Sequence, residues 1–283
     1  MNGLGNGGAS VWKATSPSWH ARQMSSPTIW SAGRYEAVAE RIAPIAAELI
    51  AAVDRRAPVS DAALVDLACG TGSAAIAAAN AGARVTAVDI TPELIAIGTQ
   101  RAEVAGRSLT WVTADASDTG LPDRSFDAVV SNMGTIFVEP TRQVADFGRL
   151  LKAGRVLAFS SWEHDDANPF FNPIVSVLGA PPSSGYSPDQ WGDAATTTAR
   201  LSTDFDDVEI EPAVHTWQFA SLDAAMRFLT NESPMHVSVL GNVDQAQHDK
   251  LLTAFEAALR AHTDADGRVS FESPYVVVTA RRR

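Results

Sequence analysis

The sequence has 283 residues, 46% of them hydrophobic, which is enough for a large α/β domain or a core domain with a cap. Its formal net charge of −11 argues against a nucleic-acid partner, because phosphate binding depends mainly on Lys and Arg. The single cysteine, Cys69, excludes a disulfide framework and a thiolate metal cluster, and no histidine pair has metal-ligand spacing, so we expect no metal.

The N-terminal part of the chain gives no signal for export or a membrane. No apolar run approaches the roughly 20 residues of a membrane helix, and no basic segment precedes an apolar core. We therefore expect a cytoplasmic protein without membrane insertion. Residues 1–29 are expected to be a flexible tail, because the first ten are rich in Gly and Asn. Apolar residues at steps of three or four then predict a helix over 34–53, bent or restarted at Pro44.

From residue 63 onward the pattern alternates between strands and helices. Strands are predicted at 63–68, 83–90, 108–115, 126–132 and 155–162. Helices are predicted between them at 72–81, 91–106 and 141–154, the second of which has Thr91 as its cap. Strands separated by helices predict a parallel, doubly wound sheet with right-handed crossovers.

The carboxyl ends of these strands form the candidate ligand site, because ligands of doubly wound sheets bind there. The strand ends carry Asp66, Asp89, Asp115, Asn132 and Trp162. A carboxylate at the second strand end is placed to accept hydrogen bonds from the hydroxyls of a ribose. The carboxylate at the third could accept from the exocyclic amine of adenine, with the N–H of Ala116 on the adjacent ring nitrogen.

The turn after the first strand has two interpretations. Gly70, Gly72 and Ala75 match G-x-G-x-x-[GA], and Asp89 lies 19 residues after Gly70, which is the spacing of a dinucleotide site. An NAD-dependent oxidoreductase is therefore an alternative. Against it, Asp66 would face a pyrophosphate unfavourably but would suit a cationic ligand. The acid at the third strand end also supplies an adenine contact that the dinucleotide pattern does not require.

Four stretches, in this order, resemble the class I S-adenosylmethionine-dependent methyltransferases, most closely their ubiquinone/menaquinone-biosynthesis-like branch. They are VDLACGTG (65–72), VTAVDIT (85–91), TADASDTGLPDRSFDAVVSNMG (113–134) and LLKAGRVLAFSSW (150–162). The resemblance implies a seven-stranded Rossmann-like sheet, mostly parallel with an antiparallel C-terminal strand and helical cap insertions. It also implies S-adenosylmethionine as cofactor and S-adenosylhomocysteine as product. Ala68 departs from the family, where many relatives have glycine, and is expected to be tolerated if its φ is negative.

The resemblance assigns roles to individual residues. It implies that Gly70 and Gly72 line the methionine and ribose part, that Asp89 holds the ribose diol, and that Asn132 backs the methionine end. Tyr35 resembles an N-terminal lid residue over the cofactor, and an ordinary core tyrosine is the alternative. The expected cofactor-binding residues are Tyr35, Asp66, Ala68, Cys69, Gly70, Thr71, Gly72, Asp89, Ile90, Asp115, Ala116 and Asn132.

The rest of the chain is expected to complete the core and to add a cap. The expected layout is lid helices (30–60), a cofactor-binding core (61–162), a cap insertion (163–192), a core helix and strand (193–220), a helical cap insertion (221–267) and a final core strand (268–283). The second insertion has predicted helices at 221–231, capped by Ser221, and at 244–262, with a capping box from Asp244 to Gln247. Both insertions are expected to gather over the carboxyl edge of the sheet.

Aromatic and apolar side chains in these segments predict a pocket for a hydrophobic or aromatic small molecule, unless they only seal the cap. The expected pocket residues are Met133, Trp162, Phe170, Tyr186, Trp191, Met235 and His236. If the acceptor is a hydroxyl or a phenol, a general base helps. His164, two residues past the fifth strand, is the first candidate for that base, ahead of His236 and Glu139.

The expected function is methyl transfer to O, N or C of a small, apolar, aromatic acceptor. Two alternatives remain open. An NAD-dependent oxidoreductase would need a Tyr/Lys or His partner at its hydride site, and the lysines Lys13, Lys152 and Lys250 offer no such pair. A methyltransferase fold could also bind the cofactor and carry out a non-methylating reaction or only regulate.

Overall fold

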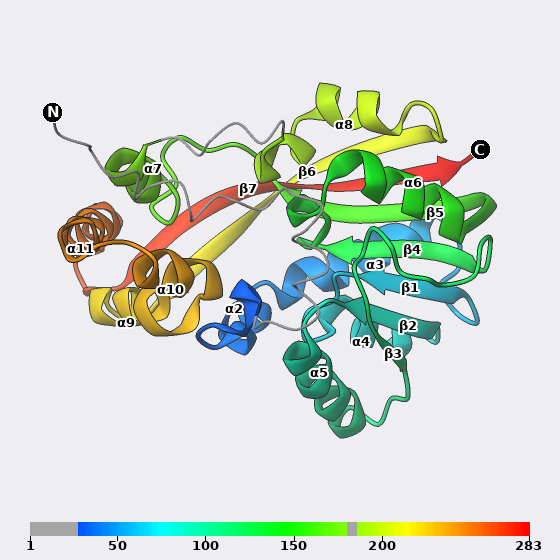
Figure 1. Ribbon diagram of the computed structural model, residues 1–283, viewed down its shortest axis with the longest axis horizontal. Coiled ribbons are helices and arrows are strands. Elements are labelled where there is room, and N and C mark those ends of the chain that lie inside the picture. The colour runs from blue at the N-terminus through cyan, green and yellow to red at the C-terminus, as the bar shows by residue number, and fades with distance from the viewer. Residues whose placement is uncertain (1–27, 180–185) are drawn as a thin grey trace, which may run out of the picture. The chain divides into compact units, whose positions relative to one another are not determined.

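The computed structural model describes residues 28–179 and 186–283 (Figure 1). The expected flexible tail lies outside the described residues except for its last two positions. By their contacts, residues 39–164, 186–215 and 273–283 form one unit, which we call the sheet unit. The described residues 28–38, 165–179 and 216–272 form the other, the helical unit. This division differs from the expected layout, because residues 39–60 and 186–192 belong to the sheet unit rather than to a lid or cap.

Seven strands form one sheet in the order β3-β2-β1-β4-β5-β7-β6. They are β1 (Ala63–Leu67), β2 (Arg84–Asp89), β3 (Thr110–Thr113), β4 (Phe126–Asn132), β5 (Leu151–Trp162), β6 (Phe205–Phe219) and β7 (Val269–Arg282). Strands β1 to β5 pair in parallel, and β7 runs antiparallel to β5. These pairings confirm the predicted doubly wound, mostly parallel Rossmann-like sheet with an antiparallel C-terminal strand.

The strand order reverses between β1 and β4, which lie side by side. The chain moves outward from β1 to β2 and β3 and then returns to the other side of β1. Both central strands are buried along most of their length, because helices cover both faces of a parallel sheet. A doubly wound sheet binds its ligand outside the carboxyl ends of the strands at such a reversal. The topology therefore places the candidate site beyond the ends of β1, β2 and β4.

Helices cover both faces of the sheet. Helices α3 and α4 pack together on one face, α6 and α8 pack together on the other, and α5 packs on β2 and β3 (Figure 1). The bounds are α3 (Ala43–Arg56), α4 (Ser73–Asn80), α5 (Pro92–Val104), α6 (Pro140–Leu150) and α8 (Ala194–Leu201), with short turns η2 (Thr135–Phe137) and η3 (Pro188–Trp191). The helix predicted over 34–53 is interrupted, because α2 (Tyr35–Arg41) ends before α3 begins, with Pro44 in the first turn of α3. Thr91 occupies the N-cap position of α5, but its side chain makes no cap hydrogen bond.

The helical unit contains short helices around a small core of its own. Its elements are η1 (Ile29–Ser31), the start of α2, α7 (Asn172–Leu178), α9 (Leu222–Arg227), the π-helical turn η4 (Phe228–Glu232), α10 (Pro234–Gly241) and α11 (Gln245–Arg260). The predicted caps are confirmed. Ser221 Oγ accepts from Ala224 N at 3.1 Å, and Asp244 and Gln247 form the capping box. In the described part of the chain, no helix combines the length and the apolarity needed to cross a membrane.

Gly192 allows η3 to close against the end of β5. A Cβ at this position would lie 2.3 Å from the carbonyl oxygen of Trp162 and 2.7 Å from the Cα of Glu163. The φ of Gly192 is −81°, which other residues adopt readily, so the restriction is purely steric. This contact brings Trp191 onto Phe159 of β5, with ring centroids 5.1 Å apart.

We expect Gly192→Ala to lower the free energy of unfolding by about 1–3 kcal/mol, the usual range for overpacking a tight contact. Urea denaturation followed by circular dichroism measures this change. Gly241→Ala is the control, because a Cβ at Gly241 would meet nothing within 4 Å. Equal effects of the two substitutions would contradict the steric account.

Candidate functional site

The turn after β1 has a left-handed backbone. Gly70 and Gly72 have φ values of 57° and 79°, a region that glycine adopts without a steric penalty. Trp111 of β3 packs against this turn, and a Cβ at Gly72 would lie 2.6 Å from its indole ring. Arg101 of α5 donates to Thr71 Oγ1 at 2.6 Å. Sequence reasoning missed Trp111 and Arg101, because neither belongs to the glycine motif that they hold in place.

Ala68 also has a left-handed backbone, with φ of 52°. The condition under which alanine was expected to be tolerated here, a negative φ, is therefore not met. The chain must turn out of β1 here, and a residue with a Cβ pays roughly 1–2 kcal/mol in this conformation. The Cβ of Ala68 also limits its neighbour, because a Cβ at Gly134 would lie 2.7 Å from it.

Two buried carboxylates lie next to the turn. Asp89 Oδ2 accepts from Gly70 N, and its Oδ1 accepts from Thr91 N, each at 2.8 Å. Asp66 Oδ2 accepts from Ala75 N at 2.9 Å, while its Oδ1 has no hydrogen-bond partner in the described part of the chain. Burial raises the pKa of Asp66 to about 8, although the Ala75 bond opposes the shift, and the charge of Asp89 raises it further. Burial also raises the pKa of Asp89.

These two carboxylates give the turn a preference for a particular kind of ligand. A buried acceptor without a donor is unfavourable until a ligand supplies one. Two adjacent buried acids also favour a ligand that carries positive charge. They disfavour an anionic ligand such as a pyrophosphate.

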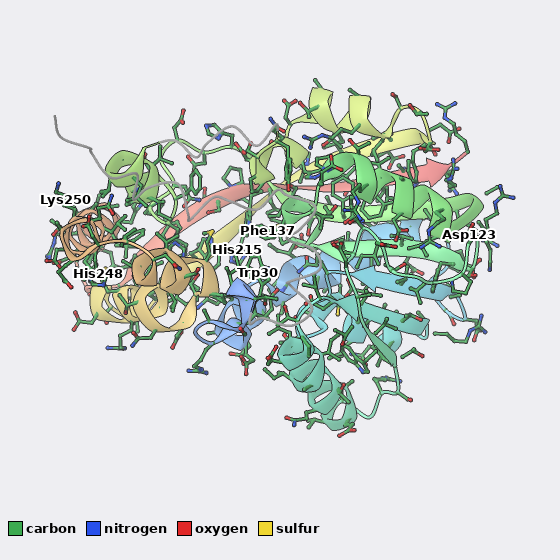
Figure 2. The ribbon with its side chains drawn as sticks, viewed as in Figure 1. Trp30, Asp123, Phe137, His215, His248 and Lys250 are labelled. Carbon is green, nitrogen blue, oxygen red and sulfur yellow. The ribbon has the colours of Figure 1, made fainter. Side chains whose placement is uncertain are left out.

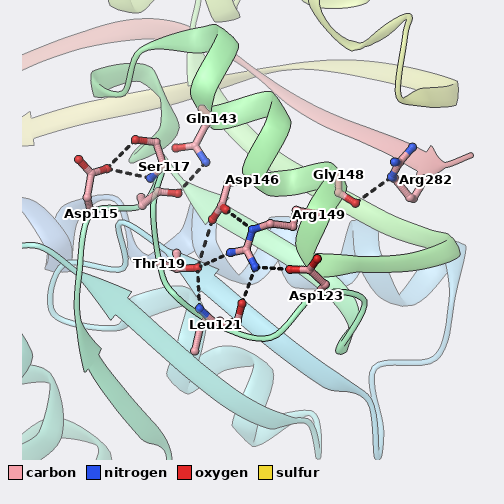
Figure 3. Close-up of polar contacts among 11 residues, drawn as sticks. Asp115, Ser117, Thr119, Leu121, Asp123, Gln143, Asp146, Gly148, Arg149 and Arg282 are labelled. Carbon is pink, nitrogen blue, oxygen red and sulfur yellow. Dashed lines mark hydrogen bonds and ion pairs between the residues drawn. The ribbon is translucent and has the colours of Figure 1, made fainter.

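The segment after β3 lies beside the end of β2, because Ala114 N donates to the carbonyl oxygen of Asp89 at 3.0 Å. Asp115 Oδ1 accepts from both the N and the Oγ of Ser117, each at 2.8 Å. Helix α6 holds the segment through Gln143, whose amide nitrogen donates to the carbonyl oxygen of Ala116 at 3.1 Å (Figure 3). The third strand end is therefore a fixed part of the same edge.

Side chains from β4 and β5 complete this edge. Asn132 Oδ1 accepts from Ser160 Oγ at 2.9 Å, and Ser160 Oγ accepts from Met133 N at 3.0 Å. Ser131 Oγ donates to the carbonyl oxygen of Leu67 at 2.8 Å, which ties β4 to the end of β1. The sheet unit thus brings the predicted strand-end residues Asp66, Asp89, Asp115 and Asn132 to one edge.

The expected pocket residues of the sheet unit have different environments. Trp162 is half-buried against Tyr275 and His215, with ring centroids 6.1 and 6.0 Å away. Tyr186 is half-buried, whereas Met133 is buried. Trp191 is fully buried in the core, so the structure gives no support to its place in a pocket. Phe137, which the sequence analysis did not select, is 42% exposed beyond the carboxyl end of β4, while Asp123 lies at the other end of that strand (Figure 2).

The expected residues of the helical unit mostly form its core. Phe170 is buried among the rings of Trp217, Phe219, Phe228, His236 and Phe271, at centroid distances of 4.8 to 6.1 Å. Met235 is half-buried on α10, and Tyr35 packs edge-on against Trp30 at 6.3 Å. Within this unit, the aromatic composition that suggested a pocket is explained by a core, because aromatic pairs bury large areas.

The three candidate bases differ in what their side chains already do. His236 Nε2 lies 2.9 Å from the carbonyl oxygen of Phe170, so it donates, and Nδ1 accepts from Ser233 Oγ at 2.7 Å. Burial lowers the pKa of His236 to about 4, so the ring is neutral and both nitrogens are occupied. Glu139 caps α6 by accepting from Thr141 N and Arg142 N. The side chains of His236 and Glu139 thus already have structural roles.

His164 is exposed and has a carboxylate partner. Its side chain is 62% exposed, and Nδ1 lies 2.7 Å from Asp189 Oδ2. Ser187 Oγ donates to the other carboxylate oxygen of Asp189. Among residues 28–179 and 186–283, no group of three His, Cys, Asp or Glu side chains could hold a metal ion.

The part of the chain that forms this edge is similar to known proteins. Residues 65–159 match the family model described as a methyltransferase domain. Over this part, the chain is similar to a methyltransferase domain. The match begins within β1 and ends within β5, so it contains all four strand-end residues of the edge.

The curated relatives of this part include demethylmenaquinone methyltransferases. The chain is 38% identical over 99 residues to the demethylmenaquinone methyltransferase of Clavibacter sepedonicus. The aligned stretch covers 35% of this chain and 40% of that protein. It is 34% identical over 152 residues, 53% of each chain, to an uncharacterized protein of Mycobacterium bovis. The chain therefore spans about half the length, or less, of these curated relatives.

Solved structures share the fold at low sequence identity. The YcgJ protein of Bacillus subtilis has a TM-score of 0.58 at 16% identity, covering 85% of this chain and 99% of its own. Phosphoethanolamine N-methyltransferase 2 of Haemonchus contortus, solved with phosphomonomethylethanolamine and S-adenosylhomocysteine, has a TM-score of 0.52 at 19% identity. It covers 83% of this chain and 52% of its own. The seven-stranded sheet is therefore that of a Rossmann-like methyltransferase.

The raised pKa of Asp66 predicts that binding of S-adenosylmethionine releases a proton. With a pKa of about 8, the carboxyl is mostly protonated at neutral pH in the free protein, and a nearby positive charge favours its ionised form. We expect the release of up to about one proton at pH 7, and an affinity that rises between about pH 6 and 8. Calorimetric titration in two buffers of different ionisation enthalpy measures the release. Asp66→Asn should abolish it, and a wild-type heat that is the same in both buffers would contradict the prediction.

Proposed function

We propose that this protein transfers the methyl group of S-adenosylmethionine to a small, apolar acceptor. The observation that carries the proposal is the pair of buried carboxylates, Asp66 and Asp89, beside the left-handed glycine turn. The unpaired Oδ1 of Asp66 suits a ligand that brings donors and positive charge, which a sulfonium amino acid does. The same feature argues against NAD, whose pyrophosphate would face a buried acid.

Each strand end has a proposed role toward the cofactor. Asp89 would accept from the ribose hydroxyls, Asp115 from the adenine amine, and Asn132 would back the methionine end. Ala116 N–H would meet a ring nitrogen of adenine. When bound, S-adenosylmethionine supplies a methyl group that is already activated by its sulfonium. The protein then has to align the two reactants and exclude water, and alignment alone can lower a barrier by roughly 7–11 kcal/mol.

Apolar side chains at the carboxyl edge of the sheet unit support a small apolar acceptor. Phe137 is 42% exposed and follows the end of β4 closely. Trp162 is half-buried at the end of β5, the neighbouring strand. Tyr186 remains a candidate contact to the acceptor. Aromatic side chains of this kind line many small-molecule sites.

We expect calorimetry to show binding of S-adenosylmethionine and S-adenosylhomocysteine but not of NAD. Asp89→Asn should weaken both sulfur nucleosides about 100-fold, because two hydrogen bonds to a charged group are affected. Asp127→Asn is the matched control. Asp127 accepts from Ala63 N and Lys152 at the amino ends of the strands, away from the turn. Binding of NAD alone would overturn the proposal, and cofactor binding without methylated product from any acceptor would favour a regulatory role.

For an acceptor with a hydroxyl group, we propose His164 as the general base. The residue follows the carboxyl end of β5, and the chain that returns at η3 supplies its partner Asp189. A carboxylate on Nδ1 orients the ring, so the other ring nitrogen is suited to accept the proton of the hydroxyl. Because a Cβ at Gly192 would collide with Trp162 and Glu163, this close return of the chain depends on a glycine.

A panel of phenols, aliphatic alcohols and amines tests the role of His164. With a phenol acceptor, His164→Gln should lower kcat by about 10²–10⁴-fold, the usual contribution of a general base. The Kd of S-adenosylhomocysteine should not change, and Asp189→Asn should give a smaller loss. His248→Gln, in the helical unit, is the control. Methylation of amines alone, or an unimpaired His164→Gln enzyme, would contradict this role.

A further inference from the structure

Gln143 is a fully buried amide in the first turn of α6, facing the loop that follows β3. Its nitrogen donates to the carbonyl oxygen of Ala116 at 3.1 Å. Its Oε1 has no hydrogen-bond partner in the described part of the chain. A buried acceptor without a donor lowers stability, so the amide is a poor choice if its only purpose is to pack α6 against the sheet.

The hydrogen bond from Gln143 does not end at Ala116. The peptide group between Ala116 and Ser117 accepts from Gln143 through its carbonyl and donates to Asp115 Oδ1 through its N–H, at 2.8 Å. Figure 3 shows this chain of contacts running from α6 through one peptide group to the Asp115 carboxylate. Hydrogen bonds in series polarise one another, and the orientation of the middle group controls the last one.

The other end of the same loop is held independently. Arg149 donates to Asp123 at 2.8 Å, to Thr119 Oγ1 at 3.0 Å and to the carbonyl oxygen of Leu121 (Figure 3). It also pairs with Asp146 of its own helix at 2.7 Å. Arg149 therefore fixes residues 119–123 on α6 without contacting Asp115 or Ala116. Gln143 acts on the part of the loop that lies nearer the carboxyl edge of the sheet, at the carbonyl oxygen of Ala116.

We propose that Gln143 is a positioning residue that sets the preference of this site for adenine. By fixing the Ala116–Ser117 peptide group, it holds the Asp115 carboxylate in the orientation in which it accepts from the exocyclic amine. The inference rests on the proposed function, which places adenine at Asp115. It assigns the discrimination between adenine and other purines to a buried residue outside the cofactor motifs.

The test compares S-adenosylhomocysteine with S-inosylhomocysteine, in which a carbonyl oxygen replaces the exocyclic amine. Calorimetry gives both Kd values for the wild type, for Gln143→Met and for the control Gln100→Met, an exposed glutamine on α5. We expect the wild type to prefer the adenine ligand strongly, because a site built to accept from an N–H rejects the analogue that lacks it. In Gln143→Met the preference should shrink about tenfold, the effect of one misaligned hydrogen bond.

Thermal unfolding of the same variants separates positioning from a purely structural role. Gln143→Met removes one hydrogen bond and one unpaired buried oxygen together, so we expect its Tm to stay close to that of the wild type. Equal weakening of both ligands with a lower Tm would assign Gln143 a structural role and overturn the inference. An unchanged ratio would overturn it as well. If the wild type binds neither nucleoside, the proposed function fails and this inference fails with it.

Discussion

The site depends on the two hydrogen bonds that the Asp89 carboxylate accepts from backbone N–H groups. One oxygen accepts from Gly70 N in the turn after β1, and the other accepts from Thr91 N at the start of α5. A single buried side chain therefore ties together the ends of two adjacent parallel strands. The backbone of the first turn is left-handed at Ala68, Gly70 and Gly72, and such a turn persists only where its surroundings hold it. Trp111 and Arg101 supply the remaining support from β3 and α5.

The same arrangement places two carboxyl groups where water is excluded. Asp66 and Asp89 are both buried, and burial raises the pKa of each. The protein thus keeps a carboxyl that a positively charged ligand can ionise. The glycine spacing fits both a methyltransferase and a dinucleotide site. The preference for a positively charged ligand favours the first of these two interpretations.

The aromatic residues of the two units have different environments. In the helical unit, the rings around Phe170 fill a core, and His236 is neutral and fully hydrogen-bonded inside it. In the sheet unit, Trp191 packs on Phe159, while Trp162 and Phe137 keep part of their surface exposed at the carboxyl edge. Composition alone does not distinguish these uses, because a small core and an apolar pocket require the same side chains.

By itself, the sequence determined the alternation of strands and helices, the parallel sheet and the strand ends that carry Asp66, Asp89, Asp115 and Asn132. It could do so because hydrophobic periodicity and turn residues are local properties of the chain. Only the tertiary structure decided that Ala68 is left-handed, that Asp189 returns to His164, and that Gln143 reaches Asp115 through a peptide group. These features depend on segments distant in the chain, whose meeting is set by the packing of helices on the sheet and leaves no periodic pattern in the sequence.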